Sequence, residues 1–273
     1  MSLTTFAVAQ LIRALPRVQL SRVVGALAEK ELGAGSARLV ERVYRSLYDV
    51  NLEEAASSGP YPSFDAFFTR ALKPGARTIA SSSLVSPADG QLSALGPIDG
   101  QGTILVKRQA YDVAELIGSA EGALRYKGGE FAVIYLSPRD YHRVHSPVDG
   151  KISSVVGIPG DLYPVNAVGE QHFEGLFVRN NRVSVHIETP TLGQVTVILV
   201  GATIVGRISV TMIPEPAVPP GVTRFSPEVP IARGDELGVF HLGSTAVVLM
   251  EPGVRIARGL GSVLYGAALT EVS

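Results

Sequence analysis

Several residue types and features are absent or scarce in this sequence of 273 residues. It contains no cysteine, which excludes disulfide bonds, thiolate chemistry and cysteine-based zinc sites. It also lacks tryptophan, and no apolar run approaches the roughly 20 residues that a helix needs to cross a bilayer. The formal net charge is -1 at pH 7, so charge gives no support for a nucleic-acid partner.

The residues that are present favour a folded, turn-rich chain. Hydrophobic residues make up 46% and charged residues 18%, which allows a substantial core and argues against disorder. The 29 glycines and 18 prolines indicate many turns, as in a β-rich body. The length is that of one large domain or two small ones.

The N-terminal part has a helical pattern. Apolar residues up to Leu15 follow helical spacing, and Pro16 is expected to break that helix. Ser21 can cap a second helix over 22–32, and a third is predicted over 37–48.

The same part is basic at its start. Residues 1–28 contain Arg13, Arg17 and Arg22 but no acidic residue. Three interpretations compete: helices packed on a core, a membrane-surface anchor with arginines at lipid phosphates, or a transit peptide. The transit peptide ranks last, because hydroxyl residues are few and the periodicity continues past residue 28.

From about residue 84 short apolar runs predict strands, over 103–107, 131–135, 182–187 and 195–200. A short helix is predicted over 110–117. An internal repeat pairs Ser86-Pro-Ala-Asp-Gly90 with Ser146-Pro-Val-Asp-Gly150, each followed by an alternating segment. This turn resembles that of lipoyl-carrier-like hybrid β-barrels. We therefore expect an α+β fold: N-terminal amphipathic helices, then a mainly antiparallel β-barrel or sandwich with an internal hybrid-barrel-like repeat.

Candidate chemical groups lie in two segments. His142 and His145, two of the five histidines, stand just before the second Asp-Gly turn. A metal site built on this pair lacks a convincing third ligand. Asp89, His145 and Ser244 could form a hydrolase triad, although the Gly-x-Ser-x-Gly elbow is missing. Asp89 and its repeat counterpart Asp149 can also be read as Asx-turn residues that bond their own backbone.

The segment Leu242-Gly-Ser-Thr245 lies between two apolar runs and is a candidate for self-cleavage. A serine hydroxyl is a weak nucleophile and needs a base, which His145 can supply while Asp89 orients the imidazole. Gly243 suits such a bond because a residue without Cβ permits strained backbone and close approach. A non-enzymatic carrier is a third interpretation. It predicts a modifiable lysine at a hairpin tip, usually beside a methionine, and none of Met1, Met212 and Met250 has a lysine as a neighbour.

Five blocks of the sequence form one ordered set: Phe64 to Ile79, Pro87-Ala-Asp-Gly90, Tyr135 to His145, Leu199 to Gly206, and Leu242-Gly-Ser-Thr245. Together they give the chain a resemblance to phosphatidylserine decarboxylases of the bacterial and mitochondrial type. They occur in family order and cover the chain from about residue 60 onward.

The resemblance implies a pyruvoyl-dependent carboxy-lyase that converts phosphatidylserine to phosphatidylethanolamine and CO2 through a Schiff base. Ser244 would become the pyruvoyl cofactor when the chain cleaves itself between Gly243 and Ser244, with Asp89 and His145 as partners in processing. Chains 1–243 and 244–273 are expected to stay associated. His145 or His142 would return a proton to the substrate, and the resemblance favours His142 as the residue nearest to it. The alternative remains a serine acyl hydrolase that uses Asp89, His145 and Ser244 without cleavage.

A lipid substrate also implies a location. Residues 1–60 would be a membrane-association region and 61–273 the catalytic domain, in a peripheral protein on the cytoplasmic face of the bacterial inner membrane; the short chain without a long leader favours this over a mitochondrial location. A homodimer is left open, and no metal is expected. Arg70, Lys73 and Arg77 are candidates for the lipid phosphate, but solvated surface charge is the favoured interpretation of all three.

Overall fold

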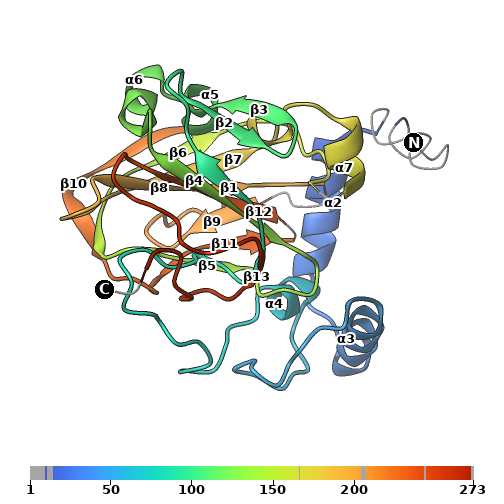
Figure 1. The fold of residues 1–273 in the computed structure, drawn as a ribbon. Coiled ribbons are helices and arrows are strands. Elements are labelled where there is room, and N and C mark those ends of the chain that lie inside the picture. Colours follow the sequence, from blue (N-terminus) through green and yellow to red (C-terminus); the bar gives the residue numbers. More distant parts are fainter. Residues whose placement is uncertain (1–9, 11–14, 166, 204–206, 243, 272–273) are drawn as a thin grey trace.

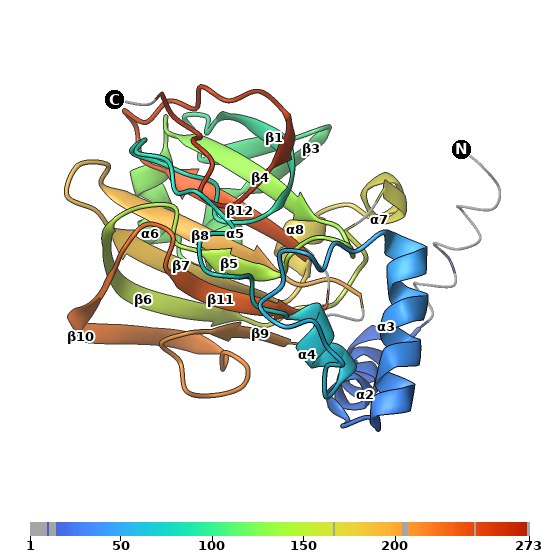
Figure 2. The ribbon, with the colours of Figure 1, turned by 90° about the horizontal axis from the view of Figure 1, so that it is seen from below.

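The computed structural model describes residues 10, 15–165, 167–203, 207–242 and 244–271. It has an α+β fold in which α2, α3 and α4 lie at one end of a mainly antiparallel β body (Figures 1 and 2). The helices are α2 (Arg17–Glu29), α3 (Ala34–Tyr48), α4 (Phe64–Phe68), α5 (Val113–Ile117), α6 (Ala120–Ala123), a 3-10 turn (Leu124–Tyr126), α7 (Ala167–His172) and α8 (Leu176–Arg179). The strands are β1 (Gly90–Pro97), β2 (Thr103–Val106), β3 (Gln109–Asp112), β4 (Glu130–Leu136), β5 (Arg143–His145), β6 (Gly150–Ile158), β7 (Arg182–Glu188), β8 (Gln194–Val200), β9 (Arg207–Val210), β10 (Gly221–Ile231), β11 (Glu236–His241), β12 (Ser244–Met250) and β13 (Gly261–Val263).

The N-terminal helices differ from the prediction at their starts. Helix α2 begins at Arg17 rather than at residue 22, with Pro16 at its N-cap. Ser21 therefore lies buried inside the helix and does not cap it. The physical reason is that proline costs little at a helix start, where the N–H that it lacks would have no intrahelical partner. The predicted third helix is confirmed as α3, and the helix predicted before Pro16 lies almost wholly outside the described residues.

Two sheets form the body. An eight-stranded sheet has the order β10-β6-β7-β8-β12-β4-β1-β13, and a three-stranded sheet has the order β5-β11-β9. All pairings between these strands are antiparallel. The large sheet runs from β10 at one edge to β13 at the other, so its order is that of an open sheet rather than of a closed ring.

Strand β12 shows why the large sheet is buried on both faces. Ala246, Val248 and Met250 pack in the core that also holds Phe240 of the three-stranded sheet. Val247 and Leu249, which alternate with these residues along the strand, point to the opposite core, which is covered by α5, α6 and α8. Successive side chains of a strand alternate between faces, so a continuous apolar run is typical of a strand covered on both sides.

The four predicted strands are confirmed as β2, β4, β7 and β8. The helix predicted over 110–117 is only half right, because its first part is strand β3, which pairs with β2. Asp112 ends that strand and caps α5 by accepting a hydrogen bond from the backbone N–H of Ala114. The side chain of an N-cap aspartate satisfies a free helix N–H, which explains where the helix starts.

Candidate functional site

The turn that carries Asp89 and the strand that begins at Ser244 belong to the same sheet. Strand β4 lies between β1 and β12, and Tyr135 of β4 pairs with both Gln91 and Thr245. Neighbouring strands lie about 4.8 Å apart, so the backbones at Asp89 and Ser244 are separated by on the order of 10 Å.

Parts of two predicted blocks fall outside the described residues. Gly243 is not described, and of Ser244 only the backbone position at the start of β12 is given. Residues 204–206, the end of the block from Leu199, also lie outside, as does Arg13.

Asp89 is held by a buried arginine. Its side chain is 6% exposed and accepts hydrogen bonds from Arg77, the shortest of which is 2.6 Å from Nη2 to Oδ2. It also accepts the backbone N–H of Tyr265 at 2.8 Å. Arg77 bonds Glu54 in addition, so one arginine joins two carboxylates. Burial opposes the charge of Arg77, but the hydrogen bonds that it donates to the two carboxylates outweigh this effect, and the pKa of the guanidinium is raised.

His145 is buried and has both ring nitrogens engaged. Nδ1 lies 2.8 Å from the carbonyl oxygen of Gly234, and Nε2 lies 3.2 Å from the hydroxyl of Tyr141. A carbonyl only accepts, so Nδ1 carries the proton and Nε2 accepts the Tyr141 hydroxyl. Burial lowers the pKa of His145 below its ordinary value, and the neutral form prevails.

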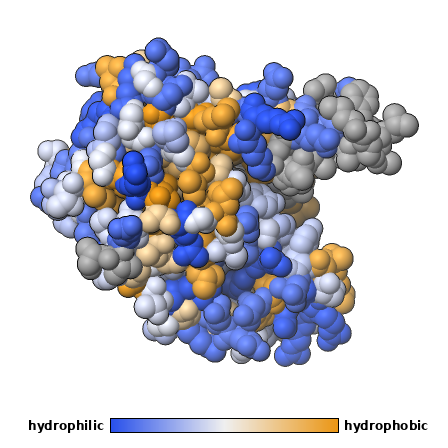
Figure 3. Space-filling view, in the orientation of Figure 1, coloured by the Kyte–Doolittle hydropathy of each residue, from blue (hydrophilic) through white to orange (hydrophobic). Residues whose placement is uncertain are grey.

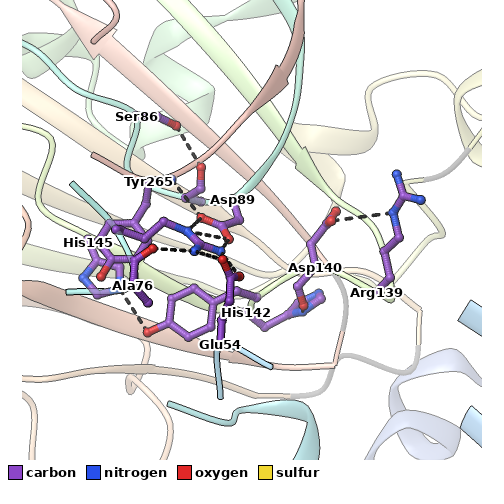
Figure 4. A network of polar contacts seen from close by, with 12 residues as sticks. Glu54, Ala76, Ser86, Asp89, Arg139, Asp140, His142, His145 and Tyr265 are labelled. Atoms are coloured by element: carbon purple, nitrogen blue, oxygen red, sulfur yellow. Dashed lines mark hydrogen bonds and ion pairs between the residues drawn. The ribbon is translucent and has the colours of Figure 1, made fainter. Parts of the chain in front are cut away.

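Asp89 and His145 are neighbours without a direct hydrogen bond between them. Both belong to the described part of the chain, and the role of Asp89 in orienting the imidazole stays a prediction. Tyr265 joins them instead: its N–H reaches Asp89, and its ring stacks on His145 with 3.8 Å between centroids and 4° between planes. Figure 4 shows the three residues side by side.

His142 faces a different neighbour from His145. Its side chain is completely buried, Nδ1 lies 2.8 Å from the carbonyl oxygen of Asp140, and its ring lies 4.0 Å from that of Phe68. Nε2 has no hydrogen-bond partner within the described residues. Burial, with a smaller contribution from the charge of Arg70, lowers the pKa of His142 to about 3. His142 is therefore a neutral acceptor, and it can donate a proton from Nε2 only after it has taken one up.

A second histidine site, missed by the sequence analysis, lies directly before the predicted cleavage bond. His241 Nδ1 is 2.9 Å from Asp65 Oδ1, and its Nε2 is 3.1 Å from Ser209 Oγ. Arg207 reaches both Asp65 and His241. Asp65, Arg207 and His241 line a cavity of about 260 Å³ together with Leu242 and part of α2. The one signal in the sequence that could have predicted this site is the position of His241, close to Ser244.

The three basic candidates near Phe64 to Ile79 have different surroundings. Lys73 is exposed and donates to the Glu53 carbonyl, as the solvated interpretation predicts. That interpretation is wrong for Arg77, which is buried against Asp89, and for Arg70, which is 5% exposed. Arg70 forms no ion pair with a described carboxylate in this structure, and burial lowers its pKa.

The N-terminal arginines also differ. Arg17 is ion-paired with Asp161 at 2.6 Å and lies over the ring of Tyr163, so it is engaged within the protein. Arg22 is exposed on α2. The interpretation that Arg17 points to lipid phosphates is therefore not supported.

Comparisons with known proteins show the family of the chain. The family model of phosphatidylserine decarboxylase matches residues 64–269. A phosphatidylserine decarboxylase proenzyme of Acinetobacter baylyi is 43% identical over 242 residues, which cover 87% of this chain and 84% of the relative. A proenzyme of the same name from Shewanella sp. (strain ANA-3) is 43% identical over 248 residues, covering 86% and 84%. The chain belongs to the phosphatidylserine decarboxylase family. The family match includes every candidate above from Asp65 onward, whereas α2 and α3 precede it.

Proposed function

We propose that this chain is a proenzyme that cleaves itself between Gly243 and Ser244, and that the mature protein decarboxylates phosphatidylserine to phosphatidylethanolamine and CO2. The observation that carries the proposal is the family match from residue 64 to 269, which spans all of the motifs from Asp89 to Ser244. The relatives' own name, proenzyme, agrees with a processing step.

The cleavage chemistry uses residues of the chain alone. Ser244 Oγ attacks the Gly243 carbonyl, the peptide C–N bond breaks, and the proton of the hydroxyl passes to the freed nitrogen. A base then takes the α-proton of Ser244 as the Cβ–Oγ bond breaks, which releases Gly243 as a carboxylate and leaves a Cα=Cβ double bond. Addition of water with loss of ammonia leaves a pyruvoyl end. His145 is the proposed base, since its neutral form prevails and Nε2 carries the lone pair, which must exchange the Tyr141 hydroxyl for that of Ser244. Asp89 acts on it through Tyr265 and through its charge.

The two products are proposed to remain together. Strand β12 lies in the interior of the large sheet, between β4 and β8, and pairs with both along its length. Residues 246–250 are completely buried. Removing this strand would expose both cores, so a cut before Ser244 leaves the short chain held in place.

In the mature protein the pyruvoyl group supplies a ketone that condenses with the substrate amine and accepts the electrons released with CO2. The serine headgroup arrives as an ammonium and must lose a proton before its nitrogen can react. A neutral imidazole with a free lone pair can take that proton and later return it to the α-carbon. His142 Nε2 has this lone pair and no described partner, which supports His142 as the residue that moves this proton.

The helical end supports a membrane-surface role for residues 1–60. Helix α2 exposes Leu20, Val23 and Leu27, and α3 exposes Leu39, Val43 and Leu47, each set with helical spacing. Hydrophobic patches are visible among hydrophilic residues on the face drawn in Figure 3. Within the described residues, no helix is long and apolar enough to span a bilayer. Such helices bind by laying an apolar face into the lipid boundary, here at the cytoplasmic face of the inner membrane.

The two Ser-Pro-x-Asp-Gly turns support the proposed internal repeat. Ser86 and Ser146 each donate to the carbonyl two residues further on. The turns also bond each other reciprocally, from the Val85 N–H to the Pro147 carbonyl and from the His145 N–H to the Pro87 carbonyl. This exchange has the form of a local two-fold relation. As a consequence, His145, which directly precedes the second copy, is hydrogen-bonded to the turn of the first copy that carries Asp89.

The proposal is tested by intact-mass analysis and by CO2 release. The purified protein should consist of chains 1–243 and 244–273, the second blocked by a pyruvoyl group that borohydride reduces. Ser244→Ala should stay whole and release no CO2 from phosphatidylserine. An active wild-type protein with an intact chain would overturn the proposal. Labelling of an uncleaved Ser244 by a fluorophosphonate would favour the acyl hydrolase, which the missing Asp89–His145 hydrogen bond disfavours.

A further inference from the structure

Leu242 has a backbone conformation that its side chain does not favour. Its φ is 84°, in the left-handed region, where a Cβ atom crowds the backbone. Two other described non-glycine residues have positive φ, and both have an ordinary reason. Asp49 ends helix α3 as its C-cap, and Lys107 lies in the tight turn between β2 and β3. Leu242 is neither a helix cap nor a hairpin turn.

The reason for the conformation is a change of sheet. His241 ends β11, which belongs to the three-stranded sheet, and Ser244 begins β12 in the eight-stranded sheet. Only Leu242 and Gly243 connect the two strands. Both ends of this connection are fixed, because His241 pairs with Arg207 and Ser244 pairs with Leu136.

Side chains hold the connection in place at His241 and Leu242. Leu242 is 9% exposed and packs in a cluster with Ala28, Phe68 and Ala202. His241 next to it is bound through both ring nitrogens, by Asp65 and by Ser209. Strained backbone persists where the surroundings over-determine it, and such strain gathers at functional sites.

We propose that Leu242 is a positioning residue whose strained backbone accelerates self-cleavage, an inference that rests on the proposed function. The strain raises the energy of the intact chain. When the acyl group of Gly243 moves from the nitrogen to the oxygen of Ser244, the connection runs through Oγ and Cβ and becomes longer. The longer connection lets Leu242 leave the left-handed region, so the strain is released as the C–N bond breaks.

The test compares Leu242→Ala with Leu242→Gly. Both variants lose the same packing, but only alanine keeps the Cβ atom that causes the strain. Cleavage is followed on denaturing gels after synthesis in a cell-free system. We expect Leu242→Gly to cleave about tenfold more slowly than Leu242→Ala. The strain energy that a Cβ atom causes in the left-handed region corresponds to a change in rate of about tenfold. In the uncleavable Ser244→Ala background, the glycine variant should have the higher melting temperature.

Lys107 provides a matched control, since it also has a positive φ of 58° but lies in the β2–β3 turn. Lys107→Gly should melt higher than Lys107→Ala, and both should cleave at the same rate. If the small variants at position 242 do not fold, Leu242→Met and Leu242→Asn replace them. Methionine keeps the strain and asparagine tolerates the conformation, so asparagine should cleave more slowly.

Equal or faster cleavage of Leu242→Gly would overturn the inference, because a position that merely needs a positive φ gains from glycine. The proposed function would survive that result, provided that the wild type cleaves and Ser244→Ala does not. A wild type that stays whole would instead remove the proposed function itself.

Discussion

The ring of Tyr265 lies flat on the imidazole of His145, with 3.8 Å between centroids, while its backbone N–H donates to Asp89. Tyr265 comes after Ser244 in the chain, and the two residues that it contacts come before it. The short product of the proposed self-cleavage therefore still supplies the ring that stacks on His145, the proposed base. This offers a reason for the two products to stay together beyond the pairing of β12.

Substitutions of Tyr265 should distinguish the effect of its ring on His145 from that of its backbone N–H on Asp89. Tyr265→Phe keeps the stack and should cleave at close to the wild-type rate. Tyr265→Ala keeps the N–H but removes the ring, and aromatic pairs contribute roughly 0.5–1.5 kcal/mol, so cleavage should slow by up to about tenfold. Gel-based cleavage rates measure both. Equal rates for alanine and phenylalanine would show that the stack does not position His145.

Asp89 should contribute to stability as well as to cleavage. Its ion pair with Arg77 is almost fully buried, with side-chain exposures of 6% and 5%. Asp89→Asn leaves the arginine with Glu54 as its one carboxylate partner, and breaking a buried pair costs about 3 kcal/mol. Denaturant unfolding in the Ser244→Ala background measures this cost.

A second substitution separates the two roles of Asp89. Adding Arg77→Met removes the buried guanidinium that has lost one of its two carboxylates, and should restore part of the lost stability. Cleavage should not return, because the carboxylate that favours the charged form of His145 is still missing. Recovery of cleavage together with stability would reduce Asp89 to a structural residue.

Buried histidines should make the protein less stable in mild acid. Burial lowers the pKa of His142 to about 3 and that of His186 to about 4. The unfolded chain takes up a proton at each histidine below about pH 6.5, whereas the folded chain does not until those lower values. Stability is therefore fully present above pH 6.5 and is lost as the pH falls, by about 1.4 kcal/mol per pH unit for each such histidine.

His186 lies outside the proposed site and allows a clean measurement. Its Nδ1 bonds the hydroxyl of Thr196, a contact that asparagine can retain. In the Ser244→Ala background, His186→Asn should reduce the slope of unfolding free energy against pH by about 1.4 kcal/mol per unit between pH 6 and 5. An unchanged slope would mean that His186 titrates normally in the folded protein.

Patterns within a segment were predictable from sequence, and contacts between distant segments were not. The apolar runs of β2, β4, β7 and β8 predicted strands correctly because the spacing of apolar residues is a local property of the sequence. The partner of Asp89 was out of reach, since the Tyr265 N–H that it accepts lies 176 positions away. The positive φ of Leu242 could not be predicted either. It arises where the chain passes from one sheet to the other, and leucine rarely adopts a positive φ.

The exposed apolar faces of α2 and α3 should bind lipid directly. Leu47 is 69% exposed on α3, and Leu105 is 62% exposed on β2, away from the helical end, so the pair forms a matched test. Burying one leucine contributes about 1.5–3 kcal/mol, hence Leu47→Glu should weaken sedimentation with phosphatidylserine–phosphatidylcholine vesicles by at least about tenfold. Leu105→Glu should leave binding unchanged, and complete self-cleavage of both variants would establish that both fold. If the two variants bind vesicles equally well, the helices do not dock on the membrane through this face.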